Sequence, residues 1–320
     1  MNGQGKLLTH FLKNADKLVI PVYQRNYDWK EEHCKKLYSD LVKTVREGKR
    51  WHFFGGIVSV SDPMGSSSDY LVIDGQQRIT TVSLLLLAIA NLVKAGIVTP
   101  KDPNLYDVIT KKYLVDEINP KQRKMKLKPI KGDQDSYDRL WGDPSEYNQS
   151  SRITQNYLYF YNQIQRDDIS VDQLFSAVEK LQIIDITLTP PDDDPQLVFE
   201  SLNSTGLDLN EGDKIRNFVL MRRSMEEQEQ FYDDYWSPIE KNASYDRQTN
   251  SYDVSPFIRD YLGIKERRLT AMKEIYQEFK DYVEKRGQIE DVLKELRDYA
   301  KRYNKIRSGS PEFPLRLRAS

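Results

Sequence analysis

In the first part of the chain the spacing of apolar residues is typical of a strand in some segments and of a helix in others. A helix is predicted from Asp28, where Asp28 and Glu31 form a capping-box pattern and apolar residues then recur at intervals of three and four up to Val45. The single cysteine, Cys34, lies on that apolar face, so we interpret it as a core residue rather than a reactive thiol. The preceding stretch, LVIPVYQRNYDW, is expected to be extended because Pro21 disfavours helical geometry in the residue before it.

Two short runs of strand-forming residues follow this helix. FFGGIVSV and YLVI are separated by the turn-forming segment SDPMGSSSD, which is typical of two antiparallel strands joined by a long loop. DGQQR and then ITTVSLLLLAIANLVKAG come directly after YLVI. The second of these segments is apolar on nearly every side, so we predict a buried helix that ends at Gly96.

The remaining pattern is mixed up to about residue 225 and helical beyond it. LQIIDITL and KQRKMKLKPIK predict strands, residues 151–181 predict helical structure, and a helix is expected to begin near Glu211. We therefore predict an α+β fold with a mixed sheet, followed by a mainly helical C-terminal region. The predicted regions are a domain over 1–225, a helical linker or oligomerisation region over 226–307, and a tail over 308–320 that we expect to be truncated or foreign to the fold.

Composition narrows the class of protein. The chain has 320 residues, 38% hydrophobic and 30% charged, which is enough to bury the cores of about two domains. Its 48 Lys and Arg nearly balance 49 Asp and Glu, so DNA binding would need a local basic patch. One cysteine and three histidines exclude a disulfide framework, a multi-cysteine zinc site and histidine-based nuclease spacing. Neither a run of about 18 apolar residues nor a signal peptide is found, so we expect a cytoplasmic protein without a membrane partner.

The strongest candidate for chemistry is the DGQQR turn between YLVI and the buried helix. Gly75 permits a sharp turn, and the free N–H groups at the start of the helix favour an anion such as a phosphate. Arg78 is expected to bind phosphate oxygens, and Asp74 to hold a magnesium ion or orient a water molecule. The alternative is a purely structural connection in which Asp74 caps the helix. The other polar residues expected to contact the nucleotide or the water are Gln76, Gln77, Thr80 and Thr81.

Two further segments carry polar residues that suit the same ligand. Tyr23, Gln24 and Arg25 form a mixture that suits phosphate contact and packing against a base or sugar. Glu200 and Asn203 are three residues apart, so on a helix they share a face and offer oxygen ligands to a hard cation. The structural alternatives are a half-buried edge strand with a paired arginine for the first segment, and helix capping with a turn for the second.

Residues 121–131 include six basic residues and no acid, which suits contact with a nucleic-acid backbone. Basic and apolar residues alternate in this segment, so the alternative is the solvated face of an edge strand that lysines protect from aggregation. The residues expected to contact DNA are Lys121, Arg123, Lys124, Lys126 and Lys128.

Four motifs together resemble one family. IPVYQRNYDW, FFGGIV, LVIDGQQRITT and FESLNSTGLDL have the order and spacing of the N-terminal domain of GmrSD-type restriction endonucleases, over about residues 5–225. The resemblance implies a ParB/sulfiredoxin-like core that binds and hydrolyses nucleoside triphosphates with Mg²⁺ at DGQQR. It also implies control of the restriction of modified phage DNA, such as glucosylated or phosphorothioate-marked DNA. Sulfiredoxin chemistry is excluded, because it needs a cysteine in the turn that reads DGQQR here.

The resemblance also assigns roles to particular residues. By analogy with ParB-type sites, Glu200 and Asn203 would lie near the metal and the triphosphate. Many family members continue into an HNH-type nuclease domain, whose residue pattern is missing from this sequence, so we expect a nuclease in another domain or subunit and a possible homo-oligomer. The family's motifs fall on Asp74, Gly75, Gln76, Gln77 and Arg78, on Tyr23, Gln24 and Arg25, and on Phe199, Glu200, Asn203 and Gly206.

Three functions follow from these observations. The first is an NTPase module whose hydrolysis licenses or resets a nuclease. The second is a reader of a modified DNA base or backbone, in which nucleotide acts only as a switch. The third is DNA nicking by the chain itself through the acids of NEGDK, although Glu211 and Asp213 fit the first turn of a helix better.

Overall fold

The chain folds into two compact units, Met1–Pro195 and Gln196–Ser320. The computed structural model describes residues 2–61, 69–116, 124–166, 169–190, 192–203, 209–221, 223, 225–246 and 251–308. The boundary at Pro195 lies about thirty residues before the division expected at 225. The reason is that helix α9 (Glu211–Leu220) packs on α12 (Ser255–Glu266) and α13 (Ile275–Arg286) of the second unit.

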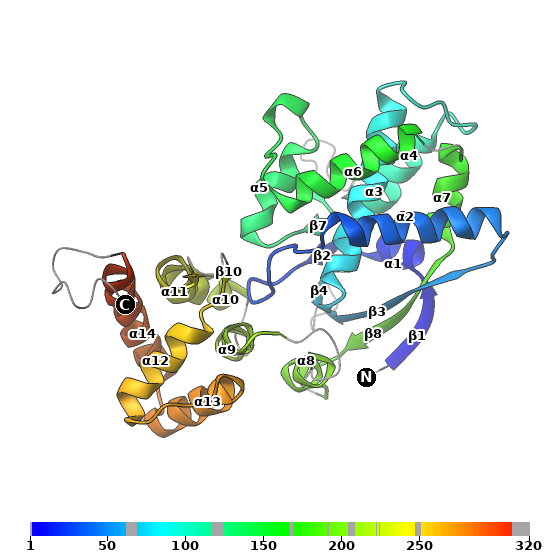
Figure 1. Cartoon of the computed structure of the whole chain (residues 1–320). Helices are drawn as coiled ribbons and strands as arrows, with labels where there is room; N and C mark the ends of the chain where they lie inside the picture. The colour runs from blue at the N-terminus through cyan, green and yellow to red at the C-terminus, as the bar shows by residue number, and fades with distance from the viewer. Residues whose placement is uncertain are drawn as a thin grey trace. The chain divides into compact units, whose positions relative to one another are not determined.

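A six-stranded mixed sheet forms the base of the first unit, in the order β1-β8-β3-β4-β2-β7 (Figure 1). β3 and β4 are antiparallel, as the two β-rich runs predicted, whereas β8 is parallel to β3 and β2 is parallel to β4. The α+β class with a mixed sheet is thus confirmed, and the likeness to the ParB core stays a prediction. The strands are β1 (Asn2–Leu7), β2 (Lys17–Val19), β3 (His52–Ser61), β4 (Asp69–Asp74), β7 (Leu127–Lys128) and β8 (Leu181–Leu188), with β5 (Val115–Asp116) and β6 (Lys124–Met125) in a separate pair.

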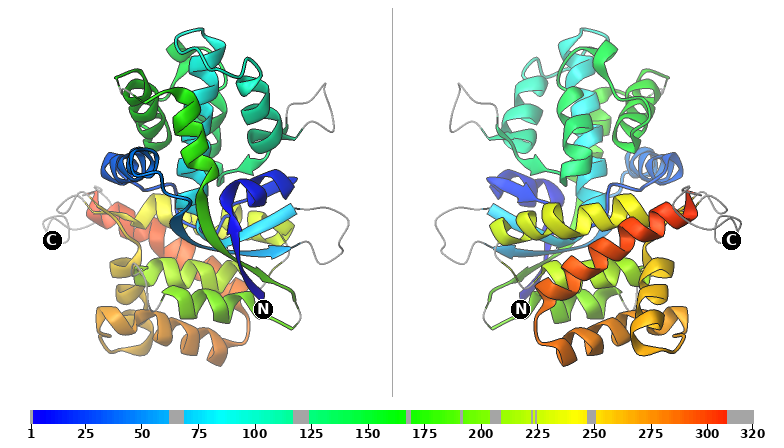
Figure 2. Two further views of the ribbon diagram at one scale, coloured as in Figure 1. Left: turned by 90° about the vertical axis from the view of Figure 1, so that its right-hand side faces the viewer. Right: turned by 90° about the vertical axis from the view of Figure 1, so that its left-hand side faces the viewer.

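The helices of the first unit gather on one face of this sheet (Figures 1 and 2). Helix α3 lies among them, and its residues are buried on nearly every side, as its apolar sequence predicted. It is the one helix of the described residues that is long and apolar enough to cross a membrane, but 83% of its most apolar window is buried inside the protein, as in a core helix. These helices are α1 (Leu8–Asn14), α2 (Glu31–Arg46), α3 (Gln76–Lys94), α4 (Leu105–Ile109), α5 (Lys131–Arg139), α6 (Arg152–Arg166) and α7 (Val171–Glu179), with a π-helix (Thr110–Leu114) and a 3₁₀ turn (Pro144–Glu146).

Local predictions near the N-terminus were partly right. Cys34 is fully buried on α2, and burial raises the pKa of its thiol to about 12, so the core interpretation is confirmed. The predicted cap at Asp28 was wrong, because α2 begins after Lys30, whose N–H group donates a hydrogen bond to His33 Nδ1 at 3.1 Å. The sequence also gave no sign of β1, which is polar and becomes a strand by pairing with β8.

The second unit is mainly helical, which confirms the expectation for the C-terminal region. Its core includes Trp236, Ile258, Phe279 and Leu293, all fully buried. The remaining elements are α8 (Pro195–Asn203), α10 (Met225–Phe231), a π-helix (Tyr232–Trp236), α11 (Ser237–Ala243), a 3₁₀ turn (Met272–Glu274), α14 (Ile289–Arg307) and the strand pair β9 (Tyr245–Asp246) and β10 (Ser251–Tyr252).

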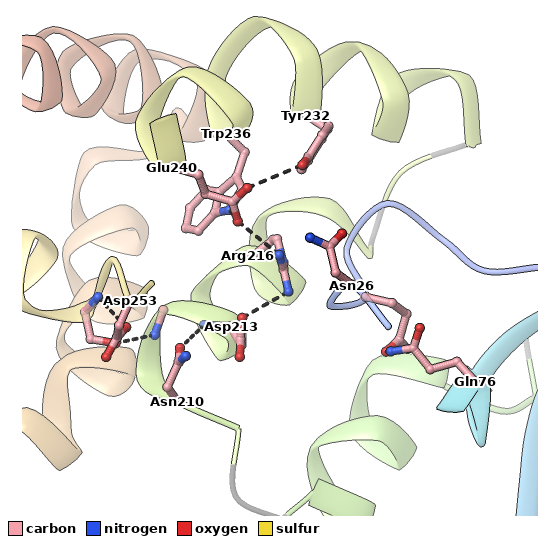
Figure 3. Close-up of polar contacts among 12 residues, drawn as sticks. Asn26, Gln76, Asn210, Asp213, Arg216, Tyr232, Trp236, Glu240 and Asp253 are labelled. Carbon is pink, nitrogen blue, oxygen red and sulfur yellow. Dashed lines mark hydrogen bonds and ion pairs between the residues drawn. The ribbon is translucent and has the colours of Figure 1, made fainter. Parts of the chain in front are cut away.

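A buried ion group joins two helices of this unit (Figure 3). Arg216 of α9, only 7% exposed, donates hydrogen bonds to Asp213 Oδ1 and Glu240 Oε1, both at 3.0 Å. Glu240 also accepts a hydrogen bond from Trp236 Nε1 at 2.8 Å and from the Tyr232 hydroxyl at 3.3 Å. Because every charge in the group has a partner, the ions fix how α9 meets α11.

Candidate functional site

The DGQQR turn has the geometry that its sequence predicted. Strand β4 ends at Asp74, Gly75 takes a left-handed φ of +96°, and α3 begins at Gln76. A Cβ at Gly75 would lie 3.1 Å from the backbone oxygen of Gly56, so this position needs glycine on two grounds. The first helical hydrogen bond runs from Ile79 N–H to Gly75 O at 3.0 Å. The N–H groups before it are therefore free of the helical ladder and carry the positive end of the helix dipole.

Arg78 is held against strand β3 rather than extended into solvent. Its Nε and Nη2 donate hydrogen bonds to Gly56 O at 3.1 and 2.6 Å, and Nη2 also bonds Asp74 Oδ2 at 2.9 Å. Gly55 has a φ of +120°, and a Cβ there would lie 3.2 Å from Arg78 Cδ and Nε, which explains the first glycine of FFGGIV. These hydrogen bonds fix the orientation of the Arg78 guanidinium. The Arg78 side chain is 25% exposed and the Asp74 side chain is 46% exposed.

Gln77 holds the loop between β2 and α2 instead of facing an open cavity. Its Oε1 accepts hydrogen bonds from the N–H groups of Asp28 at 2.9 Å and Trp29 at 3.1 Å. Its Nε2 donates to Asn26 O at 3.2 Å. The side chain is only 8% exposed, and its polar groups position the backbone of this loop. The expected role of Gln77 toward water stays a prediction.

The YQR segment and the DGQQR turn are in direct contact. Gln76 Nε2 donates to Gln24 Oε1 at 3.1 Å, and Gln24 Nε2 donates to Ile73 O at 2.7 Å. Tyr23 is buried, and burial raises the pKa of its hydroxyl. Arg25 is half-buried, and its guanidinium has no hydrogen-bond or ion-pair partner within the part of the chain that the structure describes. Arg25 follows Gln24 directly, so a guanidinium without a partner among the described residues is next in sequence to the Gln24–Gln76 hydrogen bond.

A buried polar cluster behind the turn was not anticipated. The Tyr27 hydroxyl lies 2.7 Å from Thr81 Oγ1 and accepts a hydrogen bond from Asn156 Nδ2 at 2.9 Å. The Tyr27 N–H group donates to Asp133 Oδ2 at 2.6 Å. Thr81 is fully buried and Thr80 is 4% exposed, so both lie inside α3 packing and not on the surface of the turn. The only clue in the sequence is the run of polar residues in the otherwise apolar start of α3.

An open pocket of about 350 Å³ lies between α2 and the first half of β3, with Arg78 in its wall. The rings of Trp29 and His33 stack there, with centroids 5.2 Å apart and planes inclined by 14°. The pocket is lined by Trp29, His33, Lys36, Leu37, Asp40, His52, Phe53, Phe54 and Arg78. Of these residues the sequence prediction included only Arg78, because the rest come from two elements that meet only in the fold.

The FExxNxxG segment, which runs from Phe199 to Gly206, lies at the start of the second unit, whereas DGQQR belongs to the first. Glu200 Oε1 accepts hydrogen bonds from the Tyr276 hydroxyl at 2.6 Å and from Gln196 Nε2 at 2.8 Å. Phe199 is buried and Asn203 is the last residue of α8, while Gly206 lies outside the described residues. Among the described residues no three His, Cys, Asp or Glu side chains cluster as metal ligands.

The predicted basic track needs one correction. Lys126 is buried, and its Nζ donates to the backbone oxygens of Leu12, Lys13 and Lys112 at 3.2, 2.9 and 3.1 Å. It therefore holds α1 to the π-helix and does not face DNA, and burial lowers its pKa. Lys128 is exposed on β7 at the edge of the sheet, whereas Lys121, Arg123 and the side chain of Lys124 lie outside the described residues.

The acids of NEGDK lie in the first turn of α9, as expected for helix-stabilising residues. Asp213 is paired with Arg216 as described above. Glu211 bonds Lys214 Nζ at 2.7 Å and accepts from Tyr276 N–H at 3.0 Å. Both carboxylates are thus engaged in the packing of the second unit.

A comparison with known protein families gives a match over most of the chain. The family described as GmrSD restriction endonuclease, N-terminal domain, matches residues 8–220, which is well over half of the chain. No curated protein matches the chain.

Proposed function

Because this chain belongs to the family of GmrSD restriction endonuclease N-terminal domains, we propose that it is the nucleoside-triphosphate-binding and hydrolysing regulatory module of a modification-dependent restriction system. Hydrolysis would license or reset an HNH-type nuclease that resides in another domain or subunit. We place this activity in the cytoplasm, with assembly into a homo-oligomer as one way to couple several modules.

The observation that carries the proposal is the orientation of Arg78 beside the start of α3. An arginine fixed on Gly56 O and Asp74 is pre-organised to meet phosphate oxygens, so little conformational freedom is lost on binding. The adjacent N–H groups and helix dipole favour the same anion. Arg25 adds a second positive charge next to the Gln24–Gln76 contact.

The residues of the turn fit a magnesium ion that arrives with the nucleotide. Mg²⁺ is usually held by one or two carboxylates together with phosphate oxygens and water, so a full cage of protein ligands is not required. Asp74 is 46% exposed and only its Oδ2 atom is engaged, by Arg78, among the described residues. When bound, the ion would neutralise charge on the phosphates, while Arg78 orients them.

Phosphate release with Mg²⁺ and each of the four ribonucleoside triphosphates tests the proposal. We expect Arg78→Ala to lower the rate by about 100-fold, because a pre-organised donor to the reacting phosphate is lost. Arg139→Ala is the matched control, because Arg139 also pairs with an acid four residues earlier, Asp135 at 2.8 Å, but lies on α5. Equal rates for wild type and Arg78→Ala would remove the turn from the mechanism.

Reading of modified DNA is the second candidate function, and it rests on the basic segment that ends at an edge strand. Lys128 is exposed on β7, and β7 is the last strand of the sheet order. We expect charge reversal at Lys121, Arg123 and Lys128 to weaken gel shifts of glucosylated or phosphorothioate DNA. Reversal of Lys35 and Lys43 on α2 is the control. Equal binding of modified and plain DNA by the wild-type chain would argue against a reader.

A further inference from the structure

The pocket between α2 and β3 has walls that suit a flat aromatic ligand. Trp29 and His33 form a stacked pair on the side of α2, and Phe53 of β3 also lines the pocket, with 52% of its surface exposed. Exposed aromatic surface beside a cavity is a feature of sites that a ligand covers. The volume of about 350 Å³ is within the range of small-molecule sites.

The polar groups of the pocket converge on one region. Asp40 Oδ2 lies 3.4 Å from Lys36 Nζ and 3.7 Å from His52 Nε2, so a carboxylate, an ammonium group and an imidazole meet at the wall formed by α2. Such a set can hydrogen-bond both the donors and the acceptors on the edge of a heteroaromatic ring. The aromatic side chains can then contact the faces of such a ring, while Asp40, Lys36 and His52 contact its edge.

Arg78 connects this pocket with the DGQQR turn. Arg78 lines the pocket, and its guanidinium is bonded to Asp74 at the end of β4. Trp29 makes a second connection, because its backbone N–H group is held by Gln77 of the same turn. A ligand whose anionic part lies on the turn would therefore have its next chemical group beside the aromatic walls.

We propose that this pocket binds the nucleobase of the nucleoside triphosphate whose phosphates the DGQQR turn holds. The inference rests on the proposed function and adds where the base is bound. The base stacks between the Trp29–His33 pair and Phe53, and its edge meets the group formed by Asp40, Lys36 and His52. Arg78 lies at the junction between base and phosphates.

The test measures the affinity of the full chain for Mg²⁺ complexes of ATP, GTP, CTP and UTP, and for inorganic tripolyphosphate, by calorimetry. The variant is Phe53→Ala, whose side chain is half exposed and so contributes little to folding. Trp51→Ala is the matched control, because Trp51 is 55% exposed next to the same strand but does not line the pocket. Circular dichroism and thermal melting confirm that each variant is folded.

We expect Phe53→Ala to weaken binding of the preferred nucleotide by about tenfold or more, as stacking of one base on an aromatic side chain predicts. Tripolyphosphate should bind the variant and the wild type equally, and Trp51→Ala should match the wild type for every ligand. An equal loss for tripolyphosphate, or no loss for the nucleotide, would overturn the inference.

Further outcomes show whether this inference fails alone or together with the proposed function. If Arg78→Ala stops hydrolysis while Phe53→Ala binds nucleotide like Trp51→Ala, the turn is the phosphate site and only the base pocket is wrong. If the wild-type chain binds neither nucleotide nor tripolyphosphate, both fail. A single-stranded DNA oligonucleotide provides the last arm, since loss of its binding alone in Phe53→Ala would show a site for a DNA base and overturn the assignment to the free nucleotide.

Discussion

The substitution Gln77→Met tests whether the second glutamine of DGQQR positions the loop that carries Arg25 and Trp29. Methionine has nearly the same length and helix propensity, so the change removes hydrogen bonds and little else. Three are lost, from the N–H groups of Asp28 and Trp29 and to the Asn26 oxygen. Each contributes about 1 kcal/mol, and partly buried groups are left unpaired, so we expect a loss of about 2–4 kcal/mol in the free energy of unfolding.

Two measurements follow the effect. Urea denaturation gives the change in stability, and amide hydrogen exchange over residues 24–30 shows whether the loop itself is released. We expect faster exchange at Asp28 and Trp29 and weaker nucleotide binding, because Trp29 lines the base pocket. Gln165→Met is the control, since Gln165 is exposed on α6 and donates one hydrogen bond to Tyr161 O.

A stability within about 0.5 kcal/mol of wild type, the range of ordinary surface substitutions, together with unchanged exchange would show that Gln77 does not hold this loop. Loss of hydrolysis with unchanged stability and exchange would instead support the role that the sequence predicts for Gln77, the orientation of a water molecule.

Three more outcomes are expected. Gly75→Ala should lower stability by about 1–3 kcal/mol in urea denaturation, because φ is +96° and a Cβ would lie 3.1 Å from Gly56 O; wild-type stability would show that the turn can relax. Burial raises the pKa of Asp133 from 3.8 to about 6, while the hydrogen bond from the Tyr27 N–H group acts in the opposite direction. The contribution of the protonated Asp133 carboxyl to stability is therefore full below pH 4 and is lost as pH rises through 6. Wild type should therefore lose about 1–2 kcal/mol relative to Asp133→Asn between pH 4 and pH 7, and parallel pH profiles would contradict this. Cys34 should resist alkylation at pH 8 until the chain unfolds, because it is buried and its pKa is raised to about 12; rapid labelling of the native chain would contradict the core assignment.

The sequence alone determined those features that depend on the conformational preferences and the apolar spacing of neighbouring residues. The αL turn at Gly75 needs a residue without a side chain, and the apolar run after it specifies a buried helix at once. The β3–β4 pair follows from two β-rich runs around a turn-forming loop. Cys34 was placed in the core by helical spacing alone.

Only the tertiary structure decided what the polar residues of the motifs do. Gln77 bonds backbone groups about fifty positions away, and Arg78 bonds an oxygen on a strand 22 positions earlier. Lys126 looks like a DNA contact in the sequence but is buried, because three carbonyl oxygens from two other elements surround its amine. Spacing along the chain sets which face of an element a side chain occupies, whereas its hydrogen-bond partners are set by which elements pack together, and that packing depends on contacts distant in sequence.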